Sequence, residues 1–270
     1  MRVACVQLNS RDEKAANIRA ATNFITGAAA AGARLVALPE TWNFKGGARG
    51  IAENAEDLDG PSSRVMAELA ADHGIYLLAG SIYERTDVSG RFYNTSILFG
   101  PSGERLAVYR KIHLFDVTAG GVVYRESDTL IPGRDLATAD IDGLTVGLTT
   151  CYDVRFPELY LSLALRGARL FLVPSAFKAV TGAAHWEVLL RARAVENGCF
   201  VVAPNQIGAY LPGKENYGHS MVIDPWGRVL AELAEDTGIC VADIEPSLVD
   251  EVRADLPSLD HRRPDLYDLG

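Results

Sequence analysis

Cys151 lies where an apolar run meets a polar turn, and this is a position from which a thiol can do chemistry. The apolar run covers residues 144–150, the turn covers residues 152–155, and Pro157 suits the first position of a helix. This order predicts a strand, a turn and a helix, with the thiol pointing from the strand end into a cleft. The backbone N–H of Tyr152 would lie beside the thiol and could donate to an oxyanion. The alternative is a buried structural cysteine, which is the commoner role of an intracellular cysteine.

Two other polar residues follow apolar segments in the same way. Glu40 closes an apolar run after Pro39, which cannot continue a strand ladder, and Lys111 follows the strand-like run at residues 105–109. Taken singly, such a glutamate is usually a solvated turn residue and such a lysine is usually a surface charge. Together with a thiol, however, they form a set that can cleave an amide: a nucleophile, a proton carrier and a cation for the oxyanion.

The segments around these three residues resemble the signatures of the nitrilase superfamily of carbon–nitrogen hydrolases. The segments, in the order and at the separation typical of that superfamily, are residues 38–42 (LPETW), 109–116 (YRKIHLFD) and 151–159 (CYDVRFPEL). The resemblance extends over residues 3–267. Four further segments are similar to the Nit branch of the superfamily: residues 174–177, 181–194, 217–227 and 261–267.

The resemblance implies a reaction and a role for each residue. Cys151 would attack a linear amide as a thiolate and form a thioester, with ammonia released. Glu40 would carry the protons, while Lys111 and the N–H of Tyr152 would hold the oxyanion. Glu126 matches a further acidic residue of the family and would orient Lys111 and the substrate. The alternative for Glu126 is a solvated loop carboxylate.

Fewer features of the sequence indicate which residues line the substrate pocket. Ser175 is the counterpart of Glu40 in an internal repeat, so Ser175, Phe177 and Thr181 are expected to line the pocket. Arg155 follows the nucleophile closely and could clamp a substrate carboxylate. It could equally form a structural salt bridge with Asp153 or Glu158, and the sequence leaves both interpretations open.

Within the Nit branch, the chain most resembles amidases of deaminated glutathione, followed by omega-amidases, which implies an ω-amide substrate that carries carboxylates. Hydrolysis of an N-carbamoyl amino acid or of a nitrile is the runner-up in the same chemical class. Other classes are a non-enzymatic scaffold and a metal-dependent amidohydrolase. His185 and Glu187 lack the HExxH spacing, and no phosphate loop or dinucleotide fingerprint occurs, so neither a metal nor an organic cofactor is expected.

An internal repeat predicts the architecture. Residues 30–40, 96–107 and 3–8 match residues 165–175, 220–231 and 146–151 in turn. Each half reads strand, helix, strand, helix, strand and hairpin, with helices expected at residues 17–31, 62–73 and 183–197, each ending before a glycine. Stacking the two sheets predicts an α/β fold: a four-layer αββα sandwich of two mixed sheets with an internal two-fold pseudo-repeat. Residues 1–270 would form one domain, with pocket loops at residues 43–50 and 205–215.

Composition, charge and cysteine spacing bear on the partners, the location and the redox state of the protein. The chain has 270 residues and a net charge of −9, which argues against a nucleic-acid partner. There is no apolar run of about 18 residues and no signal peptide, so a cytoplasmic protein is expected. The four cysteines lack CxxC spacing and are expected to be thiols. The resemblance implies a homodimer or higher homo-oligomer, and residues 246–270 are expected to lie on the surface or at a subunit interface.

Overall fold

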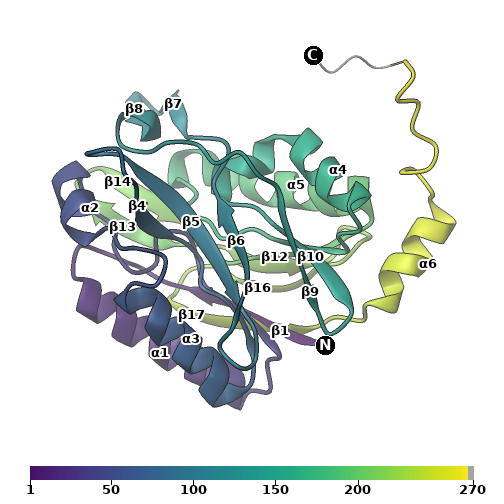
Figure 1. The fold of residues 1–270 in the computed structure, drawn as a ribbon. Coiled ribbons are helices and arrows are strands. Elements are labelled where there is room, and N and C mark those ends of the chain that lie inside the picture. The colour runs from purple at the N-terminus through teal and green to yellow at the C-terminus, as the bar shows by residue number, and fades with distance from the viewer. Residues whose placement is uncertain (267–270) are drawn as a thin grey trace.

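Two mixed β-sheets lie at the centre of the computed structural model, which describes residues 1–266 (Figure 1). The first sheet follows the order β17 (Gly238–Asp243), β1 (Arg2–Gln7), β2 (Leu35–Ala37), β3 (Tyr76–Leu78), β5 (Phe92–Phe99) and β4 (Ile82–Arg85), with β6 (Arg105–Arg110) also paired to β5. The second sheet follows the order β16 (Val229–Leu233), β15 (Ser220–Ile223), β12 (Phe200–Ala203), β11 (Leu170–Leu172), β10 (Leu144–Leu148) and β9 (Ala137–Ile141).

The two sheets have matching topology, which confirms the repeat seen in the sequence. Three parallel strands form the middle of each: β1, β2 and β3 in the first, and β10, β11 and β12 in the second. An antiparallel strand lies beyond the first of these in each sheet, β17 beside β1 and β9 beside β10. A hairpin closes the other side, β5–β6 in one half and β15–β16 in the other.

Helices cover the outer face of each sheet and complete the four layers (Figure 1). Helices α1 (Lys14–Ala30) and α3 (Pro61–His73) pack on the first sheet, and α4 (Pro157–Leu165) and α5 (Ala179–Asn197) pack on the second. The alternation of side chains along β1 shows why both faces are apolar. Val3 and Cys5 join the core between the sheets, while Ala4 and Val6 join the core under α1 and α3. The four-layer αββα prediction is therefore confirmed.

Some elements differ from the sequence-based expectation. The segment at residues 205–215, expected to be a loop, contains β13 (Ile207–Leu211) and the start of β14 (Lys214–Tyr217), which form a separate hairpin. The segment at residues 43–50 leads into a short helix, α2 (Ala48–Asn54). A further hairpin that was not predicted joins β7 (Asp116–Ala119) to β8 (Val122–Arg125). In the two unexpected hairpins, glycine and proline mark tight turns between strands.

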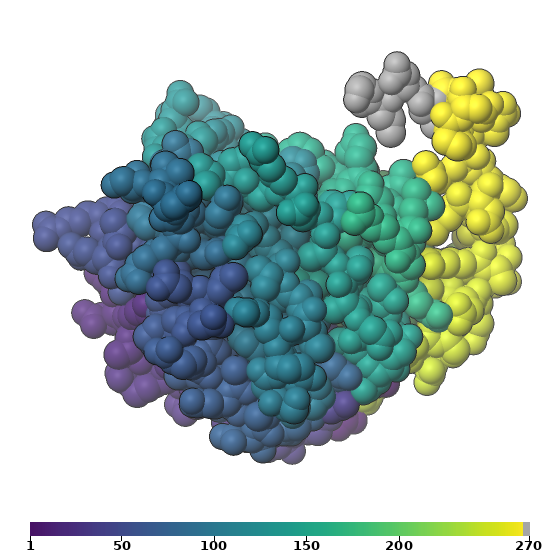
Figure 2. Space-filling model, in the orientation of Figure 1, coloured from purple at the N-terminus to yellow at the C-terminus, as the bar shows by residue number. Residues whose placement is uncertain are grey.

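The C-terminal segment begins with a helix that the sequence did not predict, α6 (Ser247–Asp255), which buries Val249 and Val252. The chain after α6 extends along the edge of the molecule and away from it (Figures 1 and 2). The last four residues of the predicted tail, and with them the end of the motif at residues 261–267, lie outside the described residues. Over residues 1–266, no helix combines the length and the apolar character needed to cross a membrane.

The exit of β2, which carries Glu40, depends on a close approach of two backbone segments. Gly80 has φ of +44°, and a Cβ at this position would overlap the carbonyl oxygen of Pro39. We expect Gly80→Ala to lower the free energy of unfolding by about 3 kcal/mol, because it combines left-handed strain with overpacking.

Gly27→Ala is the matched control, because Gly27 lies inside α1 and a Cβ there meets no atom within 4 Å. It should raise the free energy of unfolding by about 0.5–1 kcal/mol. Chemical denaturation measures both variants, and equal stability of the two would contradict the proposed constraint at Gly80.

Candidate active site

Three strand exits bring Cys151, Glu40 and Lys111 to one place. Glu40 follows β2 after two residues, and Lys111 immediately follows β6. Cys151 follows β10 of the other sheet and begins a short 3₁₀ helix, Cys151–Arg155. All three side chains are buried, with 3%, 1% and 7% of their surface exposed for Glu40, Lys111 and Cys151. The structure therefore brings together the three residues that the sequence selected.

The Lys111 ammonium binds two carboxylates. Its Nζ donates to Oε1 of Glu40 at 2.9 Å, and to Oε1 and Oε2 of Glu126 at 3.1 and 2.8 Å. Glu126 Oε2 also accepts from the backbone N–H of Phe115 at 2.8 Å. Glu126 is therefore no solvated loop residue: its side chain is 27% exposed and is fixed against the lysine.

Further donors hold the Glu40 carboxylate on both oxygens. Oε1 accepts from Nδ2 of Asn94 at 2.7 Å, and Oε2 accepts from the backbone N–H of Ala176 at 2.9 Å. The Asn94 carbonyl oxygen in turn accepts from the backbone N–H of Lys111 at 2.9 Å. Asn94 lies in the middle of β5 and was not selected from the sequence, because only the sheet pairing of β5 with β6 places it beside Lys111.

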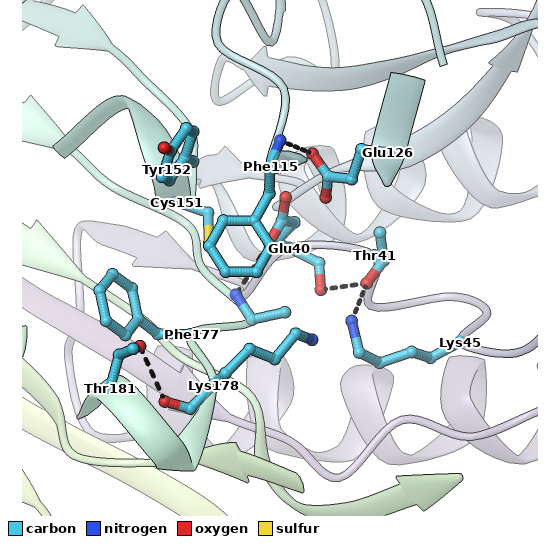
Figure 3. Close-up of a pocket in the computed structure, with 11 residues that line it drawn as sticks. Glu40, Thr41, Lys45, Phe115, Glu126, Cys151, Tyr152, Phe177, Lys178 and Thr181 are labelled. Carbon is cyan, nitrogen blue, oxygen red and sulfur yellow. Dashed lines mark hydrogen bonds between the residues drawn. The ribbon is translucent and has the colours of Figure 1, made fainter. Parts of the chain in front are cut away.

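The backbone holds Cys151 in a conformation that few side chains adopt. Its φ is +50°, in the left-handed region, and its N–H donates to the carbonyl oxygen of Pro174 at 3.0 Å. A non-glycine residue in this region costs of order 1–3 kcal/mol, which the surrounding contacts must offset. The 3₁₀ turn directs the thiol toward Glu40, and the two side chains face the same cavity in Figure 3.

The Asp153 carboxylate holds this turn in place through hydrogen bonds, a role that was not predicted from the sequence. Its Oδ2 accepts from the backbone N–H of Thr150 at 2.8 Å and from the Tyr109 hydroxyl at 2.7 Å. Its Oδ1 lies 2.8 Å from Nδ1 of His113 and 3.1 Å from the backbone N of the same residue. The suggested salt bridge from Arg155 to Asp153 is therefore wrong, because this fully buried carboxylate is bound by Thr150, Tyr109 and His113.

The charges of this cluster determine its protonation state. Burial raises the pKa of Glu40, but the nearby charges of Lys111 and Lys45 and the hydrogen bond from Lys111 outweigh it and lower the pKa to about 2. Burial alone would lower the pKa of Lys111, but the negative charges of Glu126 and Glu40 outweigh it and hold this pKa well above its usual value. At neutral pH the pair is therefore a carboxylate and an ammonium.

The Cys151 thiol, unlike Glu40 and Lys111, is held in its neutral form. Burial is the main cause that raises the pKa of Cys151, and the negative charge of Glu40 adds to it, so that the pKa reaches about 12 although Lys111 lowers it. The resting site therefore holds a neutral thiol beside a carboxylate. This differs from the thiolate expected from the sequence, because burial and the nearby Glu40 carboxylate both disfavour a negative charge on the sulfur.

A small cavity, of about 30 Å³, opens onto the thiol (Figure 3). The residues that line it are Glu40, Thr41, Lys45, Phe115, Glu126, Cys151, Tyr152, Ala176, Phe177, Lys178 and Thr181. Tyr152, Phe177 and Thr181 were expected to line it from the sequence. Lys45 and Lys178 were not, although Lys45 lies in the segment expected to be a pocket wall and Lys178 directly follows Phe177.

Two expected pocket residues lie elsewhere. Ser175 is buried behind the wall, where its Oγ donates to the carbonyl oxygen of Val173 at 3.0 Å. Arg155 has its guanidinium carbon 5.8 and 5.2 Å from the rings of Tyr152 and Phe177, and its Nη2 lies 3.3 Å from Nδ1 of His185. Arg155 forms no salt bridge with Glu158 or with any other carboxylate of residues 1–266. Within the same part of the chain, no group of three or more His, Cys, Asp or Glu side chains is arranged to hold a metal ion.

The fold and this set of buried groups define a hydrolase of carbon–nitrogen bonds. Residues 2–254 match the family model described as carbon-nitrogen hydrolase, and the chain belongs to that family. It is 42% identical to omega-amidase NIT2 of Homo sapiens, with 98% of this chain and 96% of the relative covered. It is 40% identical to deaminated glutathione amidase of Synechocystis sp. (strain PCC 6803 / GT-S), with coverage of 96% and 97%.

Solved structures agree with this assignment. The NitFhit protein of C. elegans superposes with a TM-score of 0.94 at 40% identity, over 99% of this chain and 66% of that longer chain. A variant of the amidase from Nesterenkonia sp. AN1 carries acrylamide added to its active-site cysteine. It superposes with a TM-score of 0.80 at 30% identity, over 95% of this chain and 98% of that chain.

The charge of Glu40 should control the acidity of the thiol. Because that charge raises the pKa of Cys151, we expect Glu40→Gln to lower this pKa below about 12. The pH dependence of alkylation by iodoacetamide, followed on the Cys151 peptide by mass spectrometry, measures the shift. Glu158→Gln, on the exposed start of α4, serves as the control and should leave the profile of Cys151 unchanged. An unchanged or higher pKa in Glu40→Gln would show that burial alone sets the acidity.

Proposed function

We propose that this protein is a cysteine amidase that hydrolyses the ω-amide of a carboxylate-bearing substrate and releases the amine, which is ammonia for a primary amide and cysteinylglycine for deaminated glutathione. The observation that carries the proposal is the meeting of a thiol, a carboxylate and an ammonium in one buried cluster, at Cys151, Glu40 and Lys111, with the thiol and the carboxylate lining the cavity. These are the nucleophile, proton carrier and oxyanion cation that an unactivated amide requires. A scaffold on the same fold has no need to keep an ammonium buried between two carboxylates.

The first half of the reaction forms a thioester. The Cys151 sulfur attacks the amide carbon while the thiol proton passes to Glu40, which starts as the carboxylate because its pKa is lowered to about 2. The carbonyl oxygen becomes an oxyanion held by Lys111 Nζ and the N–H of Tyr152. Loss of one such donor typically costs about 3 kcal/mol of barrier. Glu40 then gives the proton to the nitrogen, the C–N bond breaks, and the amine leaves.

The second half regenerates the thiol. Glu40, again a carboxylate, takes a proton from water as the water oxygen attacks the thioester carbon. The C–S bond breaks, the sulfur takes back the proton from Glu40, and the product leaves as a carboxylic acid. Glu126 acts through Lys111: by binding the Nζ from the other side it keeps the ammonium in place while Glu40 changes protonation.

For the substrate, we propose an ω-amide such as deaminated glutathione, with shorter ω-amides second. The names of the two curated relatives support this order of candidates, as does the lysine-rich wall of the cavity. Hydrolysis of N-carbamoyl amino acids or nitriles has no comparable support. The adduct on the active-site cysteine of the Nesterenkonia amidase supports the nucleophile assigned to Cys151.

We also infer a homodimer or higher homo-oligomer in the cytoplasm, with residues 1–270 acting as one carbon–nitrogen hydrolase unit. One core cluster draws side chains from both sheets, which supports a single unit. Large apolar side chains exposed on and near α4 and α5, those of Leu165, Val188, Val195 and Trp226, support pairing of subunits. The four buried free thiols suit a reducing compartment. The segment from residue 246 onward is a candidate part of the subunit interface.

Substrate class is tested by the amine released from four compounds: cysteinylglycine from deaminated glutathione, and ammonia from α-ketoglutaramate, an N-carbamoyl β-amino acid and a simple nitrile. We expect turnover of the two ω-amides and no turnover of the other two. Preference for the N-carbamoyl compound or the nitrile would overturn the substrate assignment while keeping the nucleophile. If no compound in the panel is turned over by a correctly folded protein, the amidase proposal itself fails.

The nucleophile is tested by Cys151→Ala, which should reduce turnover of the best substrate about a thousandfold or more, because no other group can form the thioester. Cys199→Ala is the matched control: Cys199 is also buried, but its Sγ lies 3.3 Å from the carbonyl oxygen of Ala168, away from the cavity. It should change stability more than rate. Intact-mass analysis of the acylated enzyme gives the second measurement, and near-normal activity of Cys151→Ala would disprove the mechanism.

A further inference from the structure

Lys45 is a buried ammonium for which the reaction above has no use. Its side chain lines the cavity, only 6% of the residue is exposed, and its Nζ donates to Oγ1 of Thr41 at 3.0 Å. Among residues 1–266, no carboxylate lies within 4 Å of this Nζ. Burying an ammonium without an acidic partner costs several kcal/mol, so proteins keep such groups where an anion binds or a neutral form is needed.

Lys178 reaches the same place from the other side of the cavity. Its Nζ donates to Oδ1 of Asn216 at 3.2 Å and has no carboxylate within 4 Å among the described residues. The Tyr210 ring lies beside both ammoniums, 4.9 Å from the Nζ of Lys45 and 4.5 Å from the Nζ of Lys178. Figure 3 shows the two lysine side chains extending toward one another across the cavity, beside Thr41 and Glu40.

The two carboxylates of the cavity do not neutralise these lysines by contact. Glu40 and Glu126 both bind Lys111, so the two lysines that line the cavity are left without a carboxylate contact among the described residues. Burial, followed by the charge of Lys178, lowers the pKa of Lys45 to about 8. An anion between the two lysines would remove both unfavourable effects.

The start of α5 adds to this positive potential. Lys178 is the N-cap residue of this 19-residue helix, and both Lys178 and Thr181 line the cavity. The partial positive charge of a helix N-terminus favours an anion and disfavours a lysine. A lysine at this position therefore lowers helix stability, unless a bound anion shares the site.

We propose that Lys45 and Lys178 form a carboxylate clamp that binds a carboxylate of the proposed ω-amide substrate. The far carboxylate of the substrate binds between the two ammoniums, and the amide at its other end faces Cys151. The inference rests on the proposed function, because it assigns the part of that site which recognises the substrate. It also gives the clamp to these lysines and not to Arg155, which packs on the rings of Tyr152 and Phe177 but does not itself line the cavity.

The competing explanation is that the lysines only offset the charge of Glu40, whose pKa responds to Lys45. Kinetics with two matched amides separates the two explanations. Succinamate carries a carboxylate where butyramide carries a methyl group, and both present the same primary amide. Loss of a clamp contact affects succinamate selectively, whereas loss of charge compensation at Glu40 affects both amides alike.

We expect Lys45→Met and Lys178→Met each to lower the ratio of kcat/KM for succinamate to that for butyramide by about 10–100-fold, mainly through KM. This is the range expected for loss of one charge-assisted hydrogen bond. Lys214→Met is the control: Lys214 lies farther out, over the Tyr124 ring at 5.5 Å, and does not line the inner cavity. It should change the ratio less than about threefold. A parallel fall for both amides, or an equal effect of Lys214→Met, would overturn the clamp.

A binding experiment tests the clamp without catalysis. Titration calorimetry of succinate into Cys151→Ala protein should show binding that is lost or at least tenfold weaker when Lys45→Met or Lys178→Met is added. If amides are hydrolysed but succinate binding ignores the lysines, the clamp is wrong and the proposed function stands. If succinate binds through the lysines but no amide is hydrolysed, the proposed function is wrong and the anion site stands.

The pH dependence of succinate binding gives a further check. The charged or titratable groups that act on Lys45 are Lys178, Tyr210, Glu40 and Cys151. Because the Lys45 pKa is about 8, its positive charge is present below that pH and is lost above it, so the dissociation constant of succinate should rise above about pH 8. Burial also lowers the pKa of Lys178, so Lys45→Met should reduce this rise and the Lys45→Met, Lys178→Met double variant should abolish it. A rise of the same size in Lys45→Met would overturn the role of Lys45.

Discussion

The ammonium of Lys111, buried between Glu40 and Glu126, is the interaction on which the rest of the site depends. Removing one charge of such a group leaves the other charges uncompensated, which typically costs 3–5 kcal/mol. The Nζ is within 3.1 Å of oxygens from both carboxylates, and each carboxylate is held in turn by backbone N–H groups. The strand exits must therefore meet with an accuracy of a few tenths of an ångström, and the two stacked sheets provide it.

The pseudo-repeat explains how one cavity takes its groups from both halves. The exit of β2 carries Glu40, and the equivalent exit of β11 carries the segment with Ser175 and Ala176. The two exits are joined directly, since the Glu40 N–H donates to the Ser175 carbonyl oxygen at 3.3 Å and the Ala176 N–H donates to Glu40 Oε2 at 2.9 Å. Ser175 thus serves through its backbone, whereas its repeat counterpart serves through its side chain.

The features predicted correctly from the sequence are those that local residue patterns determine. The features that were not predicted depend on contacts between residues far apart in the chain. Apolar runs that end in Cys151, Glu40 and Lys111 mark strand exits, and glycines mark the ends of α3 and α5, so these positions were predicted correctly. The capping box of Asp153 with Thr150 is a local pattern that could have been recognised, but the bond from Tyr109, more than 40 residues away, depends on the assembled fold. Lys45 has the pattern of a surface lysine, and only the assembled cavity shows that it is buried.

The protonation state of the site has a consequence for selectivity. A neutral thiol is a weak nucleophile, and Cys151 becomes reactive only when its proton can move to Glu40 as the new bond to carbon forms. That transfer is favourable only if the developing charge on the carbonyl oxygen is met by Lys111 at the same moment. A group that reaches the thiol without placing a carbonyl near Lys111 therefore gains little. The position of the amide, rather than the intrinsic reactivity of the cysteine, then limits which molecules react. A site that binds the far end of the substrate therefore controls the rate of the reaction, because it sets where the amide lies.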